Sequence, residues 1–300
     1  MRVEYVKREA AKSQYTNKKD LIFSRFVSYV VLFLLSVVVV YPFVMMVISS
    51  LTEGGSYMVG QDGALFSFQG YVKIFTSSVA VDPNTEVPYL VTGIKNTLLI
   101  TLPSTLFGLF VSAFSAYAFA KIKFKGRNTL FFIMLMTMII PGALLFVPSF
   151  IIYSRLNLVN TFFPLIIPGC FGSAMCVFFL RQAFMAIPDD YIEAAKLDGI
   201  GHFRIFWKIV VPLSAPALIS QGLLGFVGGY NDYLGPLLYL QDSRRYTLQI
   251  ALQLLYTQTV NSGDNQLFLA GTVVSLLPTI IIFLFAQKYF VKGITNSGIK

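Results

Sequence analysis

Residues 26–47 read FVSYVVLFLLSVVVVYPFVMMV, a run without a single charged side chain. A helix of about 20 predominantly apolar residues crosses the hydrocarbon core of a bilayer, so this run is long enough to span a membrane. A polar leader of about 25 residues precedes the run and no small-residue cleavage site follows it, which distinguishes it from a cleaved signal peptide. The run therefore predicts an uncleaved membrane-spanning helix.

Five further apolar runs of similar length follow along the chain. Of the 300 residues, 56% are hydrophobic and only 12% are charged, and the mean hydropathy is +0.70. A soluble domain carries about a quarter charged residues, so the composition also indicates lipid as the main solvent. The sequence predicts an all-α membrane protein with six transmembrane helices. The five further runs cover approximately 96–120, 130–153, 162–184, 212–240 and 267–291.

Lys and Arg residues gather in alternate connections between these runs. Of 23 in the chain, seven precede the first run, four follow the second, four lie in the last turn of the fourth or after it, and three lie in the last turn of the sixth or after it. Cytoplasmic segments of membrane proteins are enriched in these residues, so we expect both termini in the cytoplasm. The expected organisation is a cytoplasmic leader (1–25), one transmembrane domain (26–291) with a cytoplasmic loop (188–212), and a cytoplasmic tail (292–300). Because the net charge of +9 is spread over these short segments, it does not indicate nucleic-acid binding.

Residues that could carry chemistry are few. Cys170 and Cys176 are six positions apart in an apolar run, so on a helix they point to different faces and do not suit a disulfide or a metal pair. Because His202 is the only histidine in the sequence, a metal site with several histidines is excluded. No G-x-x-x-x-G-K-[ST] phosphate-binding loop occurs in the chain. We therefore expect no catalytic activity, no metal and no cofactor bound by this chain itself.

The cytoplasmic loop over residues 188–212 reads PDDYIEAAKLDGIGHFRIFWKIVVP. Asp190 followed three residues later by Glu193 has the spacing of a capping box. Gly199 suits the position just after a helix, where a left-handed backbone conformation is common. The pattern predicts a short helix over residues 191–198.

A second short helix is expected over residues 202–208, with Phe203, Phe206 and Trp207 on adjoining faces. Pro212 is expected in the first turn of the fifth span, where a proline is tolerated. Exposed apolar helices at this place mark either a contact with another protein or a position flat on the membrane surface. The residues alone leave these two interpretations open.

The spacing within this loop resembles the E-A-A-x-x-x-G-x(9)-I-x-L-P motif of ABC-importer permeases. The chain matches it from Glu193 to Pro212, with Val211 where leucine is usual, which is an apolar exchange. In that family the loop is a coupling helix that docks into a cleft of a cytoplasmic ATPase. The resemblance implies that Glu193 meets the ATPase, that the two alanines permit close approach and that Gly199 allows a turn. The positions assigned to coupling are Glu193, Ala194, Ala195, Gly199, Ile209 and Pro212.

Other stretches resemble the carbohydrate branch of this family, and in particular the smaller permease of the maltose transporter. These are Asn96-Thr97, the AYAFAK run over residues 116–121, and the YNDY run over residues 230–233 followed by Pro236-Leu237. The last is similar to W-N-[DE]-[FY]-x-x-P-L, with tyrosine replacing tryptophan. Members of that branch have six spans with both ends inside, as the charge pattern predicts.

The resemblance also implies the partners and the location. A second, homologous permease would complete a heterodimeric pore, two copies of a cytoplasmic ATPase would bind ATP and Mg, and an extracytoplasmic binding protein would deliver the solute. The chain itself would lie in the cytoplasmic membrane of a prokaryote, in contact with lipid.

Polar residues in or near the fifth span are candidates for the solute pathway. A carboxylate within a bilayer costs about 2.5–3.5 kcal/mol on insertion scales and is a functional candidate for that reason. Asp232 lies about 20 residues beyond Pro212, or roughly 30 Å along a helix, so the outer end of the span is an equally good position for it. The candidates are Gln221, Tyr230, Asn231, Asp232 and Tyr233. Helix packing, a solvated helix end or an aromatic belt remain alternatives for them.

The solute, the class of transporter and one amphipathic helix can also be predicted from the sequence. The solute is expected to be a sugar or oligosaccharide, with a polyol or glycerol phosphate as the alternative. An autonomous secondary transporter is the alternative from another class, although it would call for charged groups within the spans. Leu248, Ala251, Leu252 and Leu255 have helical spacing and predict an amphipathic external helix that contacts the binding protein or lies on the membrane.

Overall fold

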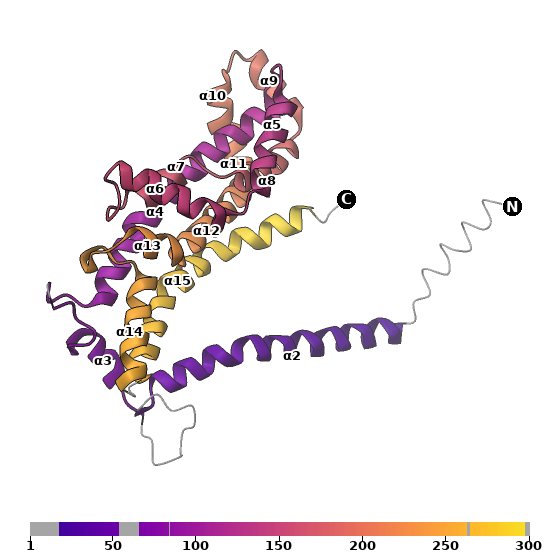
Figure 1. Cartoon of the computed structure of the whole chain (residues 1–300). Helices are drawn as coiled ribbons and strands as arrows, with labels where there is room; N and C mark the ends of the chain where they lie inside the picture. Colours follow the sequence, from indigo (N-terminus) through magenta and orange to yellow (C-terminus); the bar gives the residue numbers. More distant parts are fainter. Residues whose placement is uncertain (1–17, 54–65, 84, 263–264, 298–300) are drawn as a thin grey trace.

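The computed structural model describes residues 18–53, 66–83, 85–262 and 265–297, and within these ranges the chain is helical (Figure 1). No strand occurs among them apart from two isolated bridges, between Thr52 and Phe66 and between Val81 and Pro88. In chain order the helices are α2 (Lys18–Ser50), α3 (Gln69–Thr76), α4 (Tyr89–Lys121), α5 (Arg127–Met136), η2 (Thr137–Ile139), η3 (Gly142–Leu145), α6 (Phe146–Arg155), α7 (Phe163–Cys170), α8 (Ala174–Met185), α9 (Asp189–Leu197), α10 (His202–Ile205), the π-helical turn η4 (Phe206–Val210), α11 (Val211–Leu213), α12 (Ala215–Tyr230), α13 (Leu234–Tyr239), η5 (Ser243–Arg245), α14 (Leu248–Ser262) and α15 (Asn265–Ser297).

Helices that could cross a membrane account for most of the described chain. Four are long and apolar enough by themselves, and two bent helix pairs bring the number to six if each pair forms one span. The expectation of an all-helical membrane protein is confirmed, with four to six candidate spans in the described residues. The four are Ile22–Ser50, Tyr89–Lys121, Phe163–Met185 and Asn265–Lys288, and the pairs are Arg127–Ile139 with Gly142–Arg155 and His202–Leu213 with Ala215–Tyr230.

The third predicted run is not one straight helix. Its two halves meet at an angle of 84°, with the break at Ile140 and Pro141. Both residues have extended backbone angles, with ψ of 115° and 125°. Proline disfavours the helical conformation in the residue before it and removes one backbone donor, so Pro141 accounts for the break.

The fifth predicted run, 212–240, also differs from the structure. Its long helix, α12, ends at Tyr230, and α13 forms a separate short helix after a break at residues 231–233. At the other end, α12 meets the segment 202–213 at 83°. Ser214 lies at this bend, between Pro212 and Pro216, and proline on both sides interrupts the helical hydrogen bonds. Pro212 therefore belongs to the segment before the bend and does not open the span.

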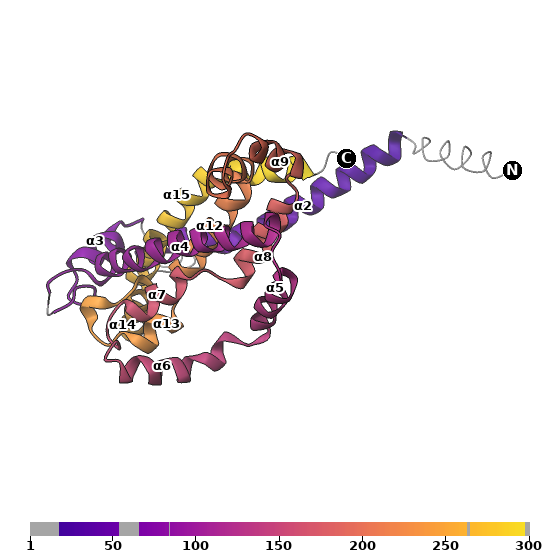
Figure 2. The same ribbon diagram turned by 90° about the horizontal axis from the view of Figure 1, so that it is seen from above.

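Helix α4 runs through the middle of the molecule and packs against α7, α8, α12 and α14 (Figures 1 and 2). Two clusters of buried apolar residues lie along it. One joins α4 with α8, α9, α10 and η4, and the other joins the start of α4 with α3, α12, α14 and α15. The views place α9 at one end of the molecule and α3 and α14 at the opposite end.

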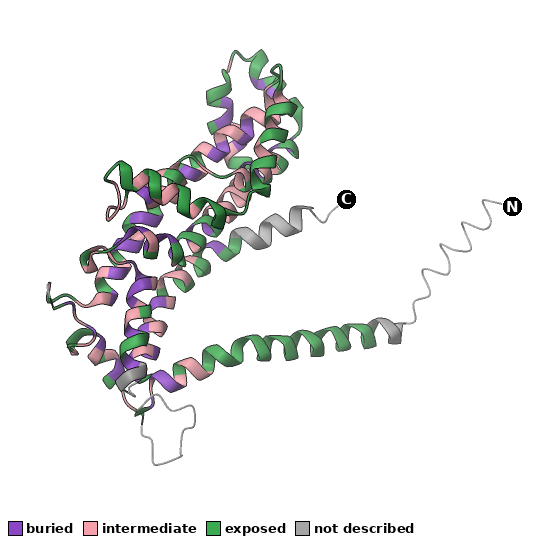
Figure 3. Cartoon of the chain, viewed as in Figure 1, coloured by how far each residue is buried: buried purple, intermediate pink, exposed green. Residues whose placement is uncertain are grey.

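Helix α2 stands apart from this body (Figures 1 and 3). None of the residues in its most apolar stretch is buried. Only its carboxyl end is attached, where Ser50 Oγ and Tyr71 Oη share a hydrogen bond at 2.8 Å and Gln266 Nε2 donates to the Ser50 carbonyl at 3.3 Å. The apolar side chains of α2 therefore face lipid or another protein.

The remaining expectations for this part of the chain have mixed outcomes. The predicted amphipathic helix is present as α14. Of its apolar stripe, Leu248, Ala251 and Leu255 are at most 1% exposed and Leu252 is half-buried. The stripe therefore packs inside the molecule, and a contact of α14 with a binding protein or a membrane surface stays a prediction. The backbone of α15 is helical through Ser297, which includes most of the expected tail 292–300. Of the expected leader, residues 1–17 lie outside the described residues.

Candidate functional site

Helix α9 is closed at its carboxyl end by a Schellman motif. Gly199 has φ +76°, its amide donates to the Lys196 carbonyl at 3.0 Å, and the Ile200 amide donates to the Ala195 carbonyl at 3.0 Å. These two bonds satisfy carbonyls that a helix end otherwise leaves open. The expectation that Gly199 stops this helix is confirmed.

The amino end of α9 differs from the expected capping box. The residue that precedes the helix is Pro188, and no side chain caps the free amides. Asp190 lies inside the first turn, so it cannot also act as the cap. Asp189 and Asp190 both place negative charge near the amino end, where it interacts favourably with the helix dipole.

The two faces of α9 have opposite surroundings. Ile192 and Ala195 are 3% and 5% exposed and belong to the apolar cluster shared with α4 and α8. Tyr191 and Leu197, in contrast, are 57% and 90% exposed, and Glu193 and Ala194 are also exposed. The two alanines of the motif therefore have different positions: Ala194 faces outward, whereas Ala195 is small because it packs against the core.

The segment after α9 leads directly into the bend before α12. Phe206 and Val210 are buried, Ile209 is half-buried and Pro212 is exposed. The π-helical turn over residues 206–210 lies just before Pro212, whose ring nitrogen cannot donate to the carbonyl four residues earlier. The missing donor explains why the regular helix is disturbed at this point.

A cavity of about 420 Å³ lies between α4, α8 and α12 in the membrane-spanning part of the molecule. Gln221 of α12 faces it, together with hydroxyl groups from α4 and from the break between α7 and α8. No charged residue is among the described residues that line it. The lining residues that provide polar side chains are Ser104, Thr105, Ser112, Ser173, Cys176 and Gln221.

The wall of this cavity depends on close packing of α4 against α7 and α8. A Cβ atom added at Gly108 would collide with the carbonyl oxygen of Gly169, so only glycine fits there. Ser112 Oγ accepts a hydrogen bond from the Ser173 amide at 3.2 Å, at the irregular backbone between α7 and α8. Irregular backbone at membrane depth is tolerated where protein or a wet cavity satisfies it. The sequence did not reveal this cavity, because its walls come from three distant segments.

The other four candidates for the solute pathway lie outside the lining of this cavity. Tyr230 is 2% exposed and its hydroxyl donates to the Ser275 carbonyl at 2.8 Å, which ties α12 to α15. Asn231 Nδ2 donates to the Val227 carbonyl at 2.9 Å. Asp232 accepts from the Gly235 amide at 3.2 Å, just before α13, and Tyr233 is half-buried. Gln221 is therefore the only one of the five that faces the cavity.

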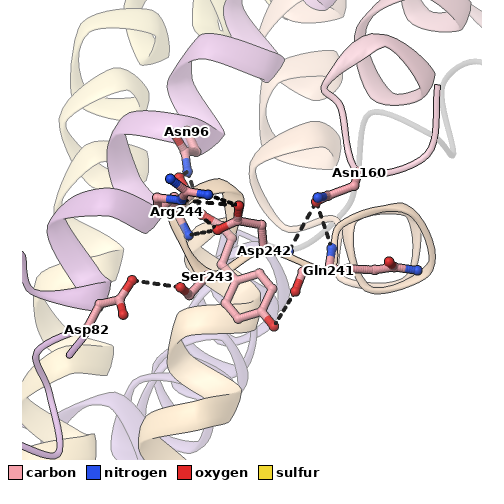
Figure 4. A network of polar contacts seen from close by, with 8 residues as sticks. Asp82, Asn96, Asn160, Gln241, Asp242, Ser243 and Arg244 are labelled. Carbon is pink, nitrogen blue, oxygen red and sulfur yellow. Dashed lines mark hydrogen bonds and ion pairs between the residues drawn. The ribbon is translucent and has the colours of Figure 1, made fainter. Parts of the chain in front are cut away.

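A polar network holds the connection between α13 and α14 (Figure 4). Asn160 Oδ1 accepts from the amides of Gln241 and Asp242, both at 3.1 Å. Ser243 Oγ donates to Asp82 at 2.7 Å, and Arg244 pairs with Asp242 at 2.7 Å. The hydrogen bonds from the Arg244 side chain and amide lower the pKa of Asp242 from 3.8 to about 2.

Two residues singled out by the resemblance contribute to the same region. Asn96 Nδ2 donates to the carbonyls of Arg244 and Tyr246, both at 3.0 Å, and Thr97 Oγ1 accepts from the Leu248 amide at 2.9 Å. Asn96 and Thr97 therefore fix the start of α14 against α4. Their place in the structure is an internal joint between two helices.

The described chain is helical with four to six candidate spans, and α9 has one face in the core and one face exposed. The family model for the inner membrane component of binding-protein-dependent transport systems matches residues 86–296. The chain belongs to this family of transport permeases, whose members are subunits of ABC importers and are not enzymes. The resemblance inferred from the α9 loop is confirmed.

Relatives of known name support the same assignment. The arabinooligosaccharides transport system permease protein AraQ of Halalkalibacterium halodurans is 33% identical over 80% of this chain and 81% of its own length. AraQ of Bacillus subtilis is 36% identical over 68% of this chain and 72% of its own length. The sn-glycerol-3-phosphate transport system permease protein UgpE of Yersinia pestis is 32% identical over 67% and 72%.

The fold is also that of a solved importer. A chain of the crystal structure of a bacterial ABC transporter for import of the acidic polysaccharide alginate superimposes with a TM-score of 0.74, at 24% identity, over 92% of this chain and 99% of that chain. Together with the family match, this makes the protein a multi-pass membrane protein of a prokaryotic importer.

Proposed function

We propose that this chain forms half of the translocation pore of an ABC importer for a sugar or oligosaccharide. In this proposal each bent helix pair contributes one span, so that six helices cross the cytoplasmic membrane and both termini are cytoplasmic. A homologous second permease completes the pore, two copies of an ATPase bind ATP and Mg, and a solute-binding protein delivers the solute from outside.

The observation that carries this proposal is the exposed face of α9. Tyr191 and Leu197 are large apolar residues, and Leu197 at 90% is the most exposed of the large hydrophobic residues described. An exposed apolar surface on a helix whose other face is fixed in the core suits a docking site for another protein. Glu193 adds one carboxylate to this face, in line with its motif role as the contact to the ATPase.

The cavity facing Gln221 supports a neutral, hydroxylated solute. Its polar lining consists of hydroxyl, thiol and amide groups, and no charged side chain is among the lining residues described. Such groups suit hydrogen bonding to sugar hydroxyls, whereas a phosphate ester would call for a cation. The similarity to UgpE supports glycerol phosphate as the second candidate, in which case the cation comes from the other permease.

A pull-down from the native membrane tests the proposed complex. The tagged chain in mild detergent is expected to bring down an ATPase and a second permease, identified by mass spectrometry. Leu197→Asp adds a charge to the exposed face of α9, and Glu193→Arg reverses one. Each is expected to reduce the amount of bound ATPase at least about tenfold, which is a loss of about 1.4 kcal/mol or more of binding free energy. The second permease should remain bound.

Thr257→Asp is the matched control, because Thr257 is also exposed but lies on α14 at the opposite end of the molecule. It should leave the ATPase bound. Recovery of the native chain alone, or as a self-oligomer without an ATPase, would reject the importer proposal in favour of an autonomous secondary transporter.

A further inference from the structure

The α9 segment is tied to the last turns of α4 by polar contacts at both of its ends. Tyr117 and Lys121 are four residues apart and therefore lie on one face of α4. Lys121 reaches the residues just before and at the start of α9, and Tyr117 reaches the residue that begins α10. These contacts lie beside the exposed face of α9 and are separate from it.

Lys121 provides the contact at the amino end of α9. Its ammonium group donates to the Ile187 carbonyl and to Asp189 Oδ1, both at 2.6 Å. The Lys121 side chain is only 3% exposed, whereas that of Asp189 is 74% exposed. The hydrogen bond and the charge of Lys121 lower the pKa of Asp189 below its ordinary value, so the carboxylate is ionised at neutral pH. A buried ammonium with two short contacts is a defined joint, unlike an ion pair between two solvated side chains.

Tyr117 provides the contact on the other side of α9. Its hydroxyl shares a hydrogen bond with His202 Nδ1 at 2.9 Å, and its ring packs against that of Phe206 with centroids 5.5 Å apart. Tyr117 itself is 3% exposed. Polar contacts therefore join the residues on both sides of α9 to the last turns of α4.

Helix α4 connects this joint with the cavity. It is a single helix from Tyr89 to Lys121, and the residues on it that line the cavity include Ser104, Gly108 and Ser112. Ser112 and Lys121 are nine residues apart, or about 13 Å along the helix. Continuous helix therefore links Lys121 to the wall of the cavity.

We propose that Lys121 and Tyr117 are positioning residues that transmit movement of the α9 loop into α4, and so into the wall of the solute cavity. Glu193 and its exposed neighbours on α9 contact the ATPase, while four residues, here named the α4 clasp (Tyr117, Lys121, Asp189 and His202), carry the movement inward. The inference rests on the proposed function, since it requires an ATPase bound to α9.

The native Cys176 thiol, which lines the cavity, reports this transmission without knowledge of the solute. The complex carries Cys170→Ser in this chain and is treated with a membrane-impermeant maleimide in inverted vesicles, either without nucleotide or with ATP and vanadate. The labelled Cys176 peptide is quantified by mass spectrometry. We expect labelling to differ by about fivefold or more between the two conditions, the lower end of typical coupling between sites.

Lys121→Met, Asp189→Asn and Tyr117→Phe are expected to reduce this difference to less than about twofold, while ATPase remains bound and hydrolyses ATP. A purely structural role would instead lower the amount of assembled complex and leave the difference intact. Lys121→Arg keeps the cation and should restore most of the difference. Asp189→Asn changes an exposed side chain, and Tyr117→Phe removes a single oxygen atom. Both variants therefore remain informative if Lys121→Met assembles poorly.

Lys125→Met and Asp190→Asn are matched controls, because they make the same chemical changes at neighbouring positions outside the clasp. They should behave as the native chain. Two results would overturn the inference but leave the proposed function standing. One is a clasp variant that keeps the full difference in Cys176 labelling. The other is a native complex with bound ATPase whose Cys176 labelling does not depend on nucleotide. A native complex without any ATPase would reject the proposed function and the inference with it.

Discussion

At the residue scale, the shape of the α9 loop depends on one backbone conformation. Gly199 adopts φ +76°, and a Cβ atom added to it would meet nothing within 4 Å. Any cost of a side chain here therefore comes from the left-handed backbone and not from a clash. Gly201, two residues further on, is equally open but has φ −71°, which any residue adopts.

Gly199→Ala is expected to destabilise the carboxyl end of α9 by about 1 kcal/mol, because the left-handed conformation is unfavourable for residues with a Cβ. Hydrogen exchange of the α9 peptide measures this directly, and its amides should exchange about fivefold faster. Gly201→Ala should leave the exchange unchanged. Equal effects of the two substitutions would show that the Schellman motif does not control this helix.

At the element scale, local features of the sequence predicted local features of the structure. The end of α9 at Gly199 and the helical spacing of Leu248 and Leu255 are encoded within a few residues. In contrast, the contact between Lys121 and Asp189 joins positions 68 residues apart, and no spacing rule reveals such a pair. The cavity beside Gln221 likewise needs three helices to form.

The sequence also misplaced helix boundaries where two tendencies compete. Apolar composition defined a run over residues 130–153 but not the angle within it, which arises because Pro141 restricts the backbone at Ile140. The residues Asn231 to Tyr233 looked like the outer part of a span because apolar residues follow them. In the structure the Asp232 carboxylate accepts a hydrogen bond from the Gly235 amide. This local bond competes with the hydrogen bonds of the helix and favours a break.

The connection between α13 and α14 provides a pH-dependent prediction. The native-state pKa of Asp242 is about 2, against 3.8 for the ordinary group. The pair with Arg244 therefore stabilises the fold fully above 3.8, and this contribution is lost as the pH falls through about 2. Near neutral pH the melting temperature of the native protein should exceed that of Asp242→Asn by a constant amount. This difference should disappear as the pH falls to about 2. A difference in melting temperature that grows on acidification would contradict the ion pair between Asp242 and Arg244.

At the scale of the whole molecule, α9 and α14 lie at opposite ends (Figure 1). Their exposed residues therefore test the proposed orientation across the membrane. Leu197→Cys and Thr257→Cys are introduced one at a time into a chain that carries Cys170→Ser and Cys176→Ser. In right-side-out vesicles an impermeant maleimide should label Cys at position 257 only, and in inverted vesicles at position 197 only.

When the chain is produced without its ATPase, both side chains are exposed, so a missing signal in one preparation must appear in the other. Labelling of both positions from the same side would contradict the arrangement in which the ends of α4 face opposite compartments. Reversed labelling would instead leave the fold intact and overturn the charge-based assignment of the termini.

The single tryptophan of the chain, Trp207, lies in the segment that joins α9 to the bend before α12. Its ring stacks on Phe110 of α4 with centroids 6.0 Å apart and is partly exposed. The intrinsic fluorescence of the isolated chain, excited where tyrosine does not absorb, therefore originates from this one place. A shift of its emission colour reports the separation of the loop from α4 optically, with no dye and no substitution.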